Sequence, residues 1–322
     1  MSKVFNWCFI GCGKLGHIVA DQILPSGRHK IVSAYTRRME QCEEFALKYG
    51  AKACTSAEEA IAAEGVDAVY IVTPHSSHYE YAKLALEMGK PVLCEKAFTV
   101  TAEETRELIA LAKEKQLYLA EAMWTWFSPV ANRVKKWLDD GEFGELTNVQ
   151  VHCRGDGRGY ARRVTEPAAA GGALLDVGVY SITYLYRLFG KPEVLDCRGV
   201  VADGIDWEEE IDLKFPGGEV YTTSASVRDP LSKPLVILEG TKARTEIPKF
   251  NSTNQAELVR ADGTRELFEG NGNYLNEFDL VAQEIREGLL ESRYVPLQHT
   301  LDIMEIMDNC RARMQLKYPF EQ

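Results

Sequence analysis

The chain reads Gly11-Cys12-Gly13-Lys14-Leu15-Gly16 directly after the apolar run Phe5–Ile10 and at the start of the helix expected over Lys14–Leu24. Glycines spaced G-x-G-x-x-G between a strand and a helix allow a tight turn, close approach of the backbone to a pyrophosphate, and close helix–strand packing. The phosphates then bind at the helix N-terminus. The stretch predicts a dinucleotide-binding site; an ordinary glycine-rich turn is the alternative.

Outward from this turn, short apolar runs alternate with amphipathic stretches over residues 1–123. Strands that are buried on both faces and alternate with helices indicate a parallel sheet. We therefore expect a doubly wound α/β Rossmann domain. Further strands are expected at Ile31–Tyr35, Ala68–Val72, Pro91–Cys94 and Tyr118–Ala120, and further helices at Met39–Tyr49, Ala57–Glu64, Tyr79–Met88 and Ala102–Lys115.

The pattern changes after about Trp124, and residues 124–322 are expected to form a second, α+β domain with a large, open, mostly antiparallel sheet. Turn signals such as Pro216-Gly217-Gly218 separate its alternating runs. The expected strands are Leu146–Cys153, Ile211–Phe215, Glu219–Val227 and Leu235–Glu239, and the expected helices are Pro129–Asp140, Ala173–Phe189, Tyr274–Leu289 and Thr300–Gln315.

Charge and cysteine placement limit the class of protein. The 322 residues include 37 Lys and Arg against 48 Asp and Glu, a net charge of −11. So acidic a chain is a poor partner for nucleic acid or an anionic membrane surface. Eight scattered cysteines without a C-x-x-C pair indicate free thiols. With no signal-peptide pattern, and no apolar run near the ~18–20 residues that span a bilayer, we expect a cytoplasmic protein.

The end of the second strand bears on which dinucleotide is bound. An NAD site usually has Asp or Glu there for the ribose 2′-hydroxyl, but this chain reads Tyr35-Thr36-Arg37-Arg38. Guanidinium groups suit a 2′-phosphate, which a carboxylate would repel. The sequence predicts a preference for NADP, with NAD possible. A solvated arginine pair is the alternative.

Three further motifs follow the glycine turn: Thr73-Pro74-His75-Ser76-Ser77-His78, Gly89-Lys90-Pro91-Val92-Leu93-Cys94-Glu95-Lys96 and Gly171-Gly172-Ala173-Leu174-Leu175-Asp176-Val177-Gly178-Val179-Tyr180. In this order they resemble the Gfo/Idh/MocA oxidoreductase family. Tyr180 and Glu121-Ala122-Met123-Trp124-Thr125 are similar to its dihydrodiol and NADP-dependent D-xylose dehydrogenases. Two departures are Ala97, where the family usually has Pro, and Trp126, where those relatives tend to have Arg.

The resemblance implies that Tyr180 is the acid/base for a reacting hydroxyl, with Lys96 beside it and Asp176 orienting Lys96 or the substrate. A free phenol has a pKa near ~10, and a nearby ammonium group lowers that value. In a helix, Asp176 and Tyr180 would lie one turn apart on one face. The alternative is that Asp176 caps the helix and Tyr180 belongs to the core.

The candidate cofactor-binding residues combine the glycine turn, the end of the second strand and the next two motifs. They are Gly11, Gly13, Lys14, Leu15, Gly16, Thr36, Arg37, Arg38, Thr73, Pro74, His75, His78, Glu95 and Lys96. The alternative for His78 is that it only starts the next helix and has no role in the site. The sequence shows no spacing typical of metal ligands.

The candidate substrate-binding residues are Trp124, Trp126, Phe127, Arg163 and Tyr180. Substrate pockets are largely apolar with a few placed polar groups, but packing at a domain boundary would equally explain the aromatic cluster. Arg163 belongs to a basic loop that is otherwise expected to be solvated.

We therefore expect an NADP-dependent oxidoreductase acting on a hydroxyl or carbonyl carbon of a sugar or cyclic trans-diol, with small molecules as its substrates. The alternatives are a redox-assisted glycosidase, which recycles its cofactor, and a non-enzymatic NADP-binding sensor. The resemblance also implies a homodimer, since an apolar open sheet face commonly marks an interface.

Overall fold

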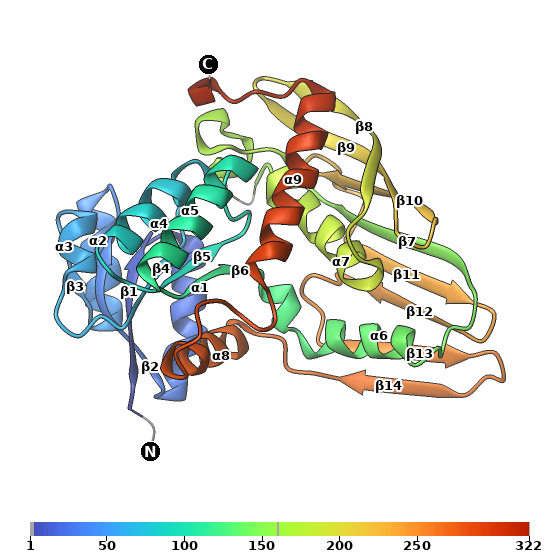
Figure 1. Cartoon of the computed structure of the whole chain (residues 1–322), viewed down its shortest axis with the longest axis horizontal. Coiled ribbons are helices and arrows are strands. Elements are labelled where there is room, and N and C mark those ends of the chain that lie inside the picture. The colour runs from blue at the N-terminus through green and yellow to red at the C-terminus, as the bar shows by residue number, and fades with distance from the viewer. Residues whose placement is uncertain (1–2, 160, 322) are drawn as a thin grey trace. The chain divides into compact units, whose positions relative to one another are not determined.

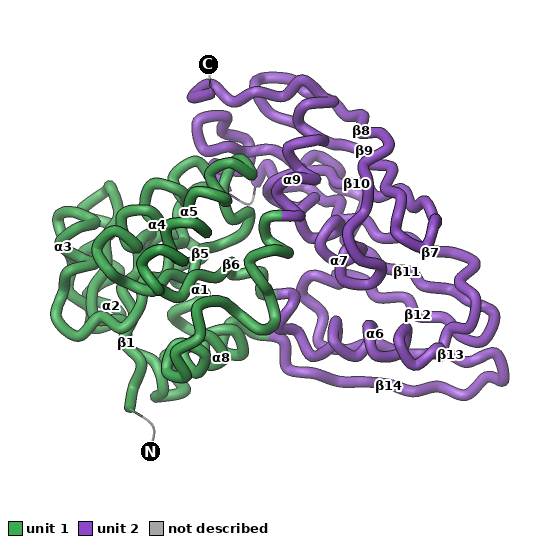
Figure 2. Tube along the Cα trace, in the orientation of Figure 1, with its two compact units in different colours: residues 1–124, 273–301 green, residues 125–272, 302–322 purple. Residues whose placement is uncertain are grey.

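The computed structural model describes residues 3–159 and 161–321, and the chain divides into two compact units (Figure 2). Unit 1 comprises Met1–Trp124 and Asn273–Leu301, and unit 2 comprises Thr125–Gly272 and Asp302–Gln322. The sequence analysis placed everything after residue 123 in the second domain. The structure differs for Asn273–Leu301, because this segment buries Phe278 in the core of unit 1.

Unit 1 contains a six-stranded, all-parallel sheet in the order β3-β2-β1-β4-β5-β6 (Figure 1). The strand order reverses between β1 and β4. Ligands of open α/β sheets bind beyond the carboxyl ends of the strands at such a point, so the glycine turn after β1 is at the expected place. The strands are β1 (Phe5–Ile10), β2 (His29–Tyr35), β3 (Lys52–Ala53), β4 (Ala68–Ile71), β5 (Val92–Glu95) and β6 (Leu119–Ala122).

Helices cover both faces of this sheet because successive side chains of each strand point to opposite faces. In β1, Trp7 and Phe9 enter one apolar cluster, whereas Cys8 and Ile10 enter the other. The first cluster includes α1, α2 and α8, and the second includes α3, α4 and α5. The helices are α1 (Lys14–Ile23), α2 (Met39–Tyr49), α3 (Ala57–Ile61), α4 (His78–Glu87), α5 (Ala102–Lys115) and α8 (Tyr274–Arg286).

Unit 2 contains an eight-stranded sheet in the order β14-β13-β12-β11-β7-β10-β9-β8. Only the β10–β7 pair is parallel among the described pairings, so the expected mostly antiparallel sheet is confirmed. The strands are β7 (Leu146–Arg154), β8 (Glu193–Ala202), β9 (Ile205–Lys214), β10 (Val220–Ser226), β11 (Leu235–Gly240), β12 (Ala243–Pro248), β13 (Gln255–Arg260) and β14 (Arg265–Glu269).

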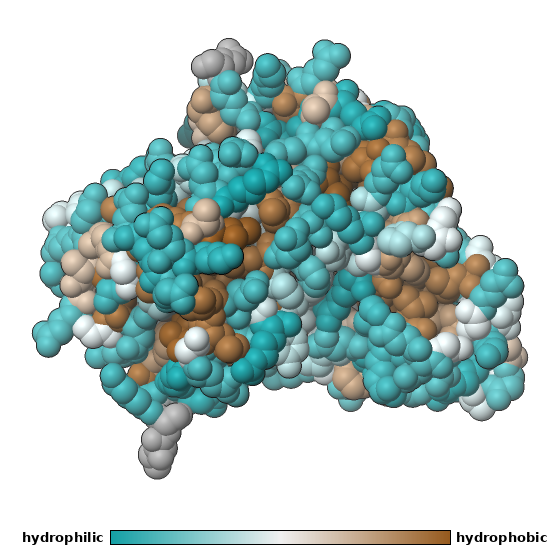
Figure 3. Space-filling model, in the orientation of Figure 1, coloured by the Kyte–Doolittle hydropathy of each residue, from teal (hydrophilic) through white to brown (hydrophobic). Residues whose placement is uncertain are grey.

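The helices α6 (Pro129–Asp139) and α7 (Val179–Phe189) pack against this sheet, and α9 (Leu297–Met314) enters unit 2 at Asp302 (Figure 1). The stretch Pro167–Phe189 is long and apolar enough to cross a membrane, with mean hydropathy 1.3, which corrects our expectation that no run approaches that length. Because 83% of the apolar 18-residue window in this stretch is buried, the stretch belongs to the core of unit 2. Hydrophilic residues cover most of the surface shown in Figure 3.

Candidate functional site

The three glycines of the first turn have three different surroundings. Gly11 has a φ of 115°, and a Cβ on it would lie 2.6 Å from the carbonyl oxygen of Val72. A Cβ on Gly16 would lie 2.8 Å from the carbonyl oxygen of Gly11, whereas one on Gly13 would meet nothing within 4 Å. Gly11 and Gly16 are therefore required by the fold. Gly13 faces open space, as a residue that lets a ligand approach the backbone would.

The start of α1 suits an anion. Gly13 is the N-cap, no side chain caps the helix, and the first turn carries no acidic residue. The first N–H groups of a helix have no partner within the helix, and together with the helix dipole they favour negative charge. The pyrophosphate of a dinucleotide fits this arrangement. Lys14, at the first position of the helix, is exposed.

The end of β2 presents cationic side chains. Thr36 is half-buried, and Arg37 and Arg38 are exposed. Arg38 donates a hydrogen bond to Oε1 of Gln41 at 2.9 Å. Neither arginine forms an ion pair with a carboxylate in the described part of the chain, so both charges are available to a phosphate group.

Two loops of unit 1 are joined by His78. Its buried ring has Nδ1 at 2.9 Å from the carbonyl oxygen of Ala97 and Nε2 at 2.9 Å from that of Thr73. His75 packs edge-to-face on this ring at 5.7 Å. The side chain thus ties the loop after β4 to the loop that carries Lys96, although His78 also starts α4, as the alternative supposed. The peptide bond between Lys96 and Ala97 is cis.

The Lys96 side chain is 8% exposed and follows β5 directly. Nearby lies a group of three buried carboxyls, Glu95, Glu121 and Glu277, of which only Glu95 was a predicted site residue. Tyr70 donates to Oε1 of Glu95 at 2.7 Å, and Thr300 donates to Oε2 of Glu121 at 2.9 Å.

Burial is the main cause of the unusual titration of these acids. It raises the pKa of Glu121 to about 7, with the charge of Glu95 adding to the effect and that of Lys96 opposing it. Burial, with Glu95 and Glu121 contributing, also raises the pKa of Glu277 well above its usual value. Neither oxygen of Glu277 has a hydrogen-bond partner among the described residues. The sequence signal that could have revealed Glu95 and Glu121 as buried acids is their position inside the apolar strands β5 and β6.

In unit 2 the third motif forms an unusual helix start. Residues Leu174–Gly178 make a π-helical turn, which passes directly into α7. Such turns are rare and occur frequently at functional sites. Asp176 lies in this turn and Tyr180 is the second residue of α7, so the simple α-helical spacing that we expected between them does not apply. Tyr180 is half-buried.

The carboxylate of Asp176 has a cationic partner within unit 2. Nη1 of Arg163 donates to Oδ1 of Asp176 at 2.8 Å, and the Asp176 side chain is only 10% exposed. The sequence analysis expected Asp176 to orient Lys96 or a substrate. The ion pair between Arg163 and Asp176 thus joins two predicted site residues. Arg163 belongs to unit 2, as Asp176 does, and it holds the Asp176 carboxylate in place.

The aromatic residues after β6 are divided between the units. Trp124 packs on Tyr274 at 5.6 Å in unit 1, whereas Trp126 and Phe127 are buried in unit 2. The guanidinium of Arg187 lies 5.2 Å from the ring centre of Trp126 and also donates to its carbonyl oxygen. Packing therefore accounts for a large part of the surroundings of Trp126.

Comparison with known proteins covers both units. A model of an oxidoreductase family with an NAD-binding Rossmann fold matches residues 5–122, and a model of the GFO/IDH/MocA C-terminal domain matches residues 131–246. The chain is 32% identical to trans-1,2-dihydrobenzene-1,2-diol dehydrogenase of Mus musculus over 98% of each chain. It is 31% identical to D-xylose 1-dehydrogenase (NADP(+)) of Hypocrea jecorina, over 91% of this chain and 85% of that one.

Two solved structures show the same fold. A 3-ketoreductase from Actinomadura kijaniata, in complex with NADP and TDP-benzene, superimposes with a TM-score of 0.88 at 20% identity, covering 97% of this chain and 98% of that one. An aldose-aldose oxidoreductase from Caulobacter crescentus, complexed with glycerol, superimposes with a TM-score of 0.86 at 19% identity and the same coverage.

Proposed function

The chain belongs to the Gfo/Idh/MocA oxidoreductase family, and on that premise we propose that it transfers a hydride between NADP and a CH–OH carbon of a sugar or cyclic trans-diol. It is an NAD(P)-binding oxidoreductase; the proposal concerns its cofactor preference, its substrate class and its catalytic residues. Relatives named as a diol dehydrogenase and a xylose dehydrogenase support this substrate class.

The single observation that carries the proposal is the glycine turn. Of the three glycines in the turn, Gly11 and Gly16 are closely packed and only Gly13 faces open space. The helix that follows has no side-chain cap and no acidic residue in its first turn. These features fit the pyrophosphate of a dinucleotide. Arg37 and Arg38 beyond β2 favour the 2′-phosphate of NADP, since neither is paired with a carboxylate in residues 3–159 and 161–321.

A bound nicotinamide would supply the hydride acceptor for oxidation of the substrate carbon and the hydride donor for its reduction. Tyr180 takes the hydroxyl proton during oxidation and returns it during reduction. Lys96 supplies a positive charge that favours the phenolate of Tyr180 and polarises a substrate carbonyl. Asp176, held by Arg163 at 2.8 Å, orients the polar groups of the substrate. Trp124, Trp126 and Phe127 contribute apolar pocket wall.

The test is NADPH absorbance of the purified protein with NADP or NAD and a panel of aldoses and cyclic trans-diols. We expect turnover with NADP on at least one class. Comparable KM values for NADP and NAD would contradict the cofactor preference. No change in absorbance with either cofactor, although NADP binds, would instead favour a glycosidase that recycles its cofactor, or a sensor.

We also propose a homodimer in the cytoplasm. Apolar side chains stay exposed on β8 and β10 of unit 2, namely Leu195, Val200, Val201 and Val220, and such a surface suits an interface. Eight buried free cysteines suit a reducing compartment. Light scattering at micromolar concentration tests the first point, since a purely monomeric protein would contradict it, and cell fractionation tests the second.

A further inference from the structure

Strand β9 of unit 2 carries two buried acids, Asp206 and Glu209, which are 0% and 1% exposed. Residues three apart in a regular strand point to opposite faces. Here a bulge intervenes, because Val201 pairs with Asp206 and Val200 with Glu208, which leaves Trp207 without an opposite residue. The extra residue places both carboxyls on one face of the sheet, where the charge of Asp206 acts on Glu209.

The two carboxyls lie against the segment that carries Asp176 and Tyr180. Oδ2 of Asp206 accepts a hydrogen bond from the backbone N–H of Leu174 at 2.6 Å, at the start of the π-helical turn. A Cβ on Gly172 would lie 2.0 Å from Oδ1 of Asp206, and one on Gly178 would lie 2.7 Å from Oε1 of Glu209. The glycines of the Gly171–Tyr180 motif therefore leave the space that the two acids occupy.

The pair has no cationic partner in the described part of the chain. Oδ1 of Asp206 and both oxygens of Glu209 have no hydrogen-bond donor there. Two adjacent buried carboxylates cannot both stay ionised, so they share a proton. Burial raises the pKa of Glu209 well above its usual value and that of Asp206 less, because Asp206 accepts the Leu174 N–H. This order of pKa values favours the proton on Glu209 rather than on Asp206.

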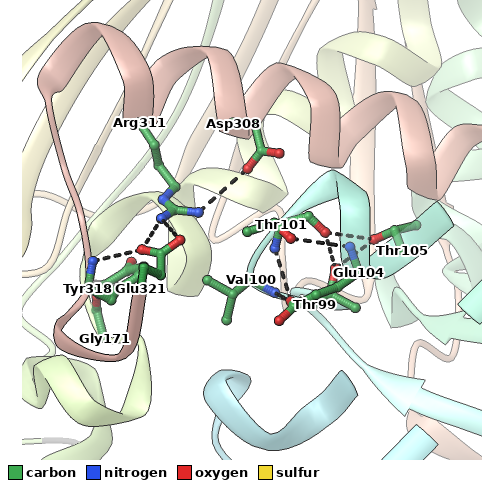
Figure 4. A network of polar contacts seen from close by, with 10 residues as sticks. All are labelled: Thr99, Val100, Thr101, Glu104, Thr105, Gly171, Asp308, Arg311, Tyr318 and Glu321. Atoms are coloured by element: carbon green, nitrogen blue, oxygen red, sulfur yellow. Dashed lines mark hydrogen bonds and ion pairs between the residues drawn. The ribbon is translucent and has the colours of Figure 1, made fainter. Parts of the chain in front are cut away.

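The other titratable groups around the pair come from β7, β8, α9 and the C-terminal segment. Arg154 of β7 acts on Glu209 only weakly, because it pairs with Glu208 and Asp229. The neighbouring groups also include Cys197, Cys310 and Tyr318. The hydrogen bond to Cys197 and burial raise the pKa of Cys310, and burial raises that of Tyr318, so these two groups are neutral near pH 7. The hydroxyl of Tyr318 donates to the carbonyl oxygen of Gly171, so it too contacts the motif (Figure 4).

We propose that Asp206 and Glu209 form a proton-sharing pair that positions the π-helical turn, and with it Asp176 and Tyr180, for the reaction. This inference rests on the proposed function for its catalytic consequence. With one shared proton, Asp206 is held by Glu209 on one side and holds the Leu174 N–H on the other. When that proton is lost at alkaline pH, two buried anions repel each other and the turn loosens.

The experiment compares the full-length wild type with Glu209→Gln and Glu209→Leu. A glutamine amide donates to Asp206 at every pH, whereas leucine donates at none. We expect kcat of Glu209→Leu to fall roughly tenfold to hundredfold, since small misplacements of catalytic groups cost about that much. Glu209→Gln should recover most of the loss and should lack the alkaline decline of kcat that the wild type shows. NADP affinity, measured by titration, should stay within about twofold in all three.

Thr223→Val is the matched control, because Thr223 is equally buried in the neighbouring strand β10 and its hydroxyl bonds only the carbonyl oxygen of Val151 among the described residues. It should lower stability without changing the pH profile. Superimposable pH profiles of wild type and Glu209→Gln would overturn the proposal. So would a Glu209→Leu enzyme no slower than the Thr223→Val control.

Two readouts need no turnover, and so separate a failure of this inference from a failure of the proposed function. The infrared difference spectrum between wild type and Glu209→Gln near pH 7 should show loss of a protonated carboxyl band. Amide exchange over 174–180 should be faster in Glu209→Leu than in Glu209→Gln. If either effect is missing, the pair does not position the turn. If the infrared and amide-exchange effects are both present but no hydride transfer is detected, the proposed function is wrong and the proposed role of Asp206 and Glu209 in positioning the turn is supported.

Discussion

At the scale of single residues, the Tyr180 hydroxyl is the group on which the proposed chemistry depends most. Tyr180→Phe removes only that oxygen, so the turn and the cofactor site stay intact. We expect kcat to fall by roughly 10²–10⁴-fold, the usual contribution of a positioned acid or base, with NADP affinity unchanged. Steady-state kinetics together with NADP titration measure both quantities.

A matched control lies one helical turn further along α7. Tyr184 is buried, and its hydroxyl has no hydrogen-bond partner in the described residues. Tyr184→Phe should therefore leave kcat within about twofold of the wild type. Near-normal turnover in Tyr180→Phe would refute the assignment of the acid/base.

Glu121 predicts a pH-dependent stability. Burial raises its pKa from 4.5 to about 7, so the folded state holds the proton more tightly than the unfolded state. Stability therefore falls as pH rises from about 4.5 through 7. At ~1.4 kcal/mol per pKa unit the charged form costs the fold roughly 3 kcal/mol near pH 8.

Glu121→Gln removes that titration and keeps an oxygen to accept from Thr300. Urea unfolding should show the variant more stable by roughly 3 kcal/mol near pH 8, and this advantage should shrink toward zero below about pH 4.5, where both states of the wild type are protonated. An advantage independent of pH would show that burial does not perturb this carboxyl.

Arg37 and Arg38 predict the choice of cofactor. Replacing both by Ala removes charged donors for a 2′-phosphate, at about 1.5–3 kcal/mol for each hydrogen bond to a charged group. We expect KM for NADP to rise at least roughly tenfold while KM for NAD changes little. An equal rise for both cofactors would mean that these arginines do not discriminate between them.

At the scale of elements, the capping box of α5 shows local sequence fixing a helix start. Thr101 Oγ1 accepts from the backbone N–H of Glu104, whose carboxylate accepts from the N–H of Thr101 (Figure 4). Thr101→Ala should lower the free energy of unfolding by about 1 kcal/mol, measured by denaturant titration, and should leave KM for NADP unchanged. A loss below about 0.3 kcal/mol would contradict the capping role.

The elements also show where sequence could predict structure. The β1–α1 turn was predictable because the motif is short and contiguous: Gly11 adopts a φ of 115° and Gly16 packs against the Gly11 carbonyl, whereas Gly13 leaves open space. Strands β3, β8, β12, β13 and β14 were not predicted. Strand β8 is exposed at most of its positions, so it lacks the alternation that marks a half-buried strand.

Long-range packing accounts for what sequence missed in the site. Lys96, Asp176 and Tyr180 stay predictions of the resemblance, whereas the bulge at Trp207, between Asp206 and Glu209, depends on pairing with β8. The start of the π-helical turn likewise has a long-range contact, since the Leu174 N–H bonds the Asp206 carboxylate. The same holds for Asn273–Leu301, whose apolar residues match α1, α2 and the sheet of unit 1 although they lie far along the chain.

At the scale of the whole molecule, each unit contributes a separate part of the proposed reaction. Unit 1 carries the glycine turn and Lys96, and unit 2 carries Asp176 and Tyr180. Although the chain carries a net charge of −11, Arg37 and Arg38 are exposed at the end of β2. A charge distribution of this kind suits a small anionic cofactor better than an extended polyanion.

The most direct test of hydride transfer uses a sugar or trans-diol that turns over in the absorbance panel, deuterated at the carbon that is oxidised, with NADP and the wild-type protein. We predict that mass spectrometry finds deuterium in the reduced nicotinamide ring, in proportion to product formed. Tyr180→Phe should show almost none. NADPH without deuterium, or product without any reduced cofactor, would contradict the account.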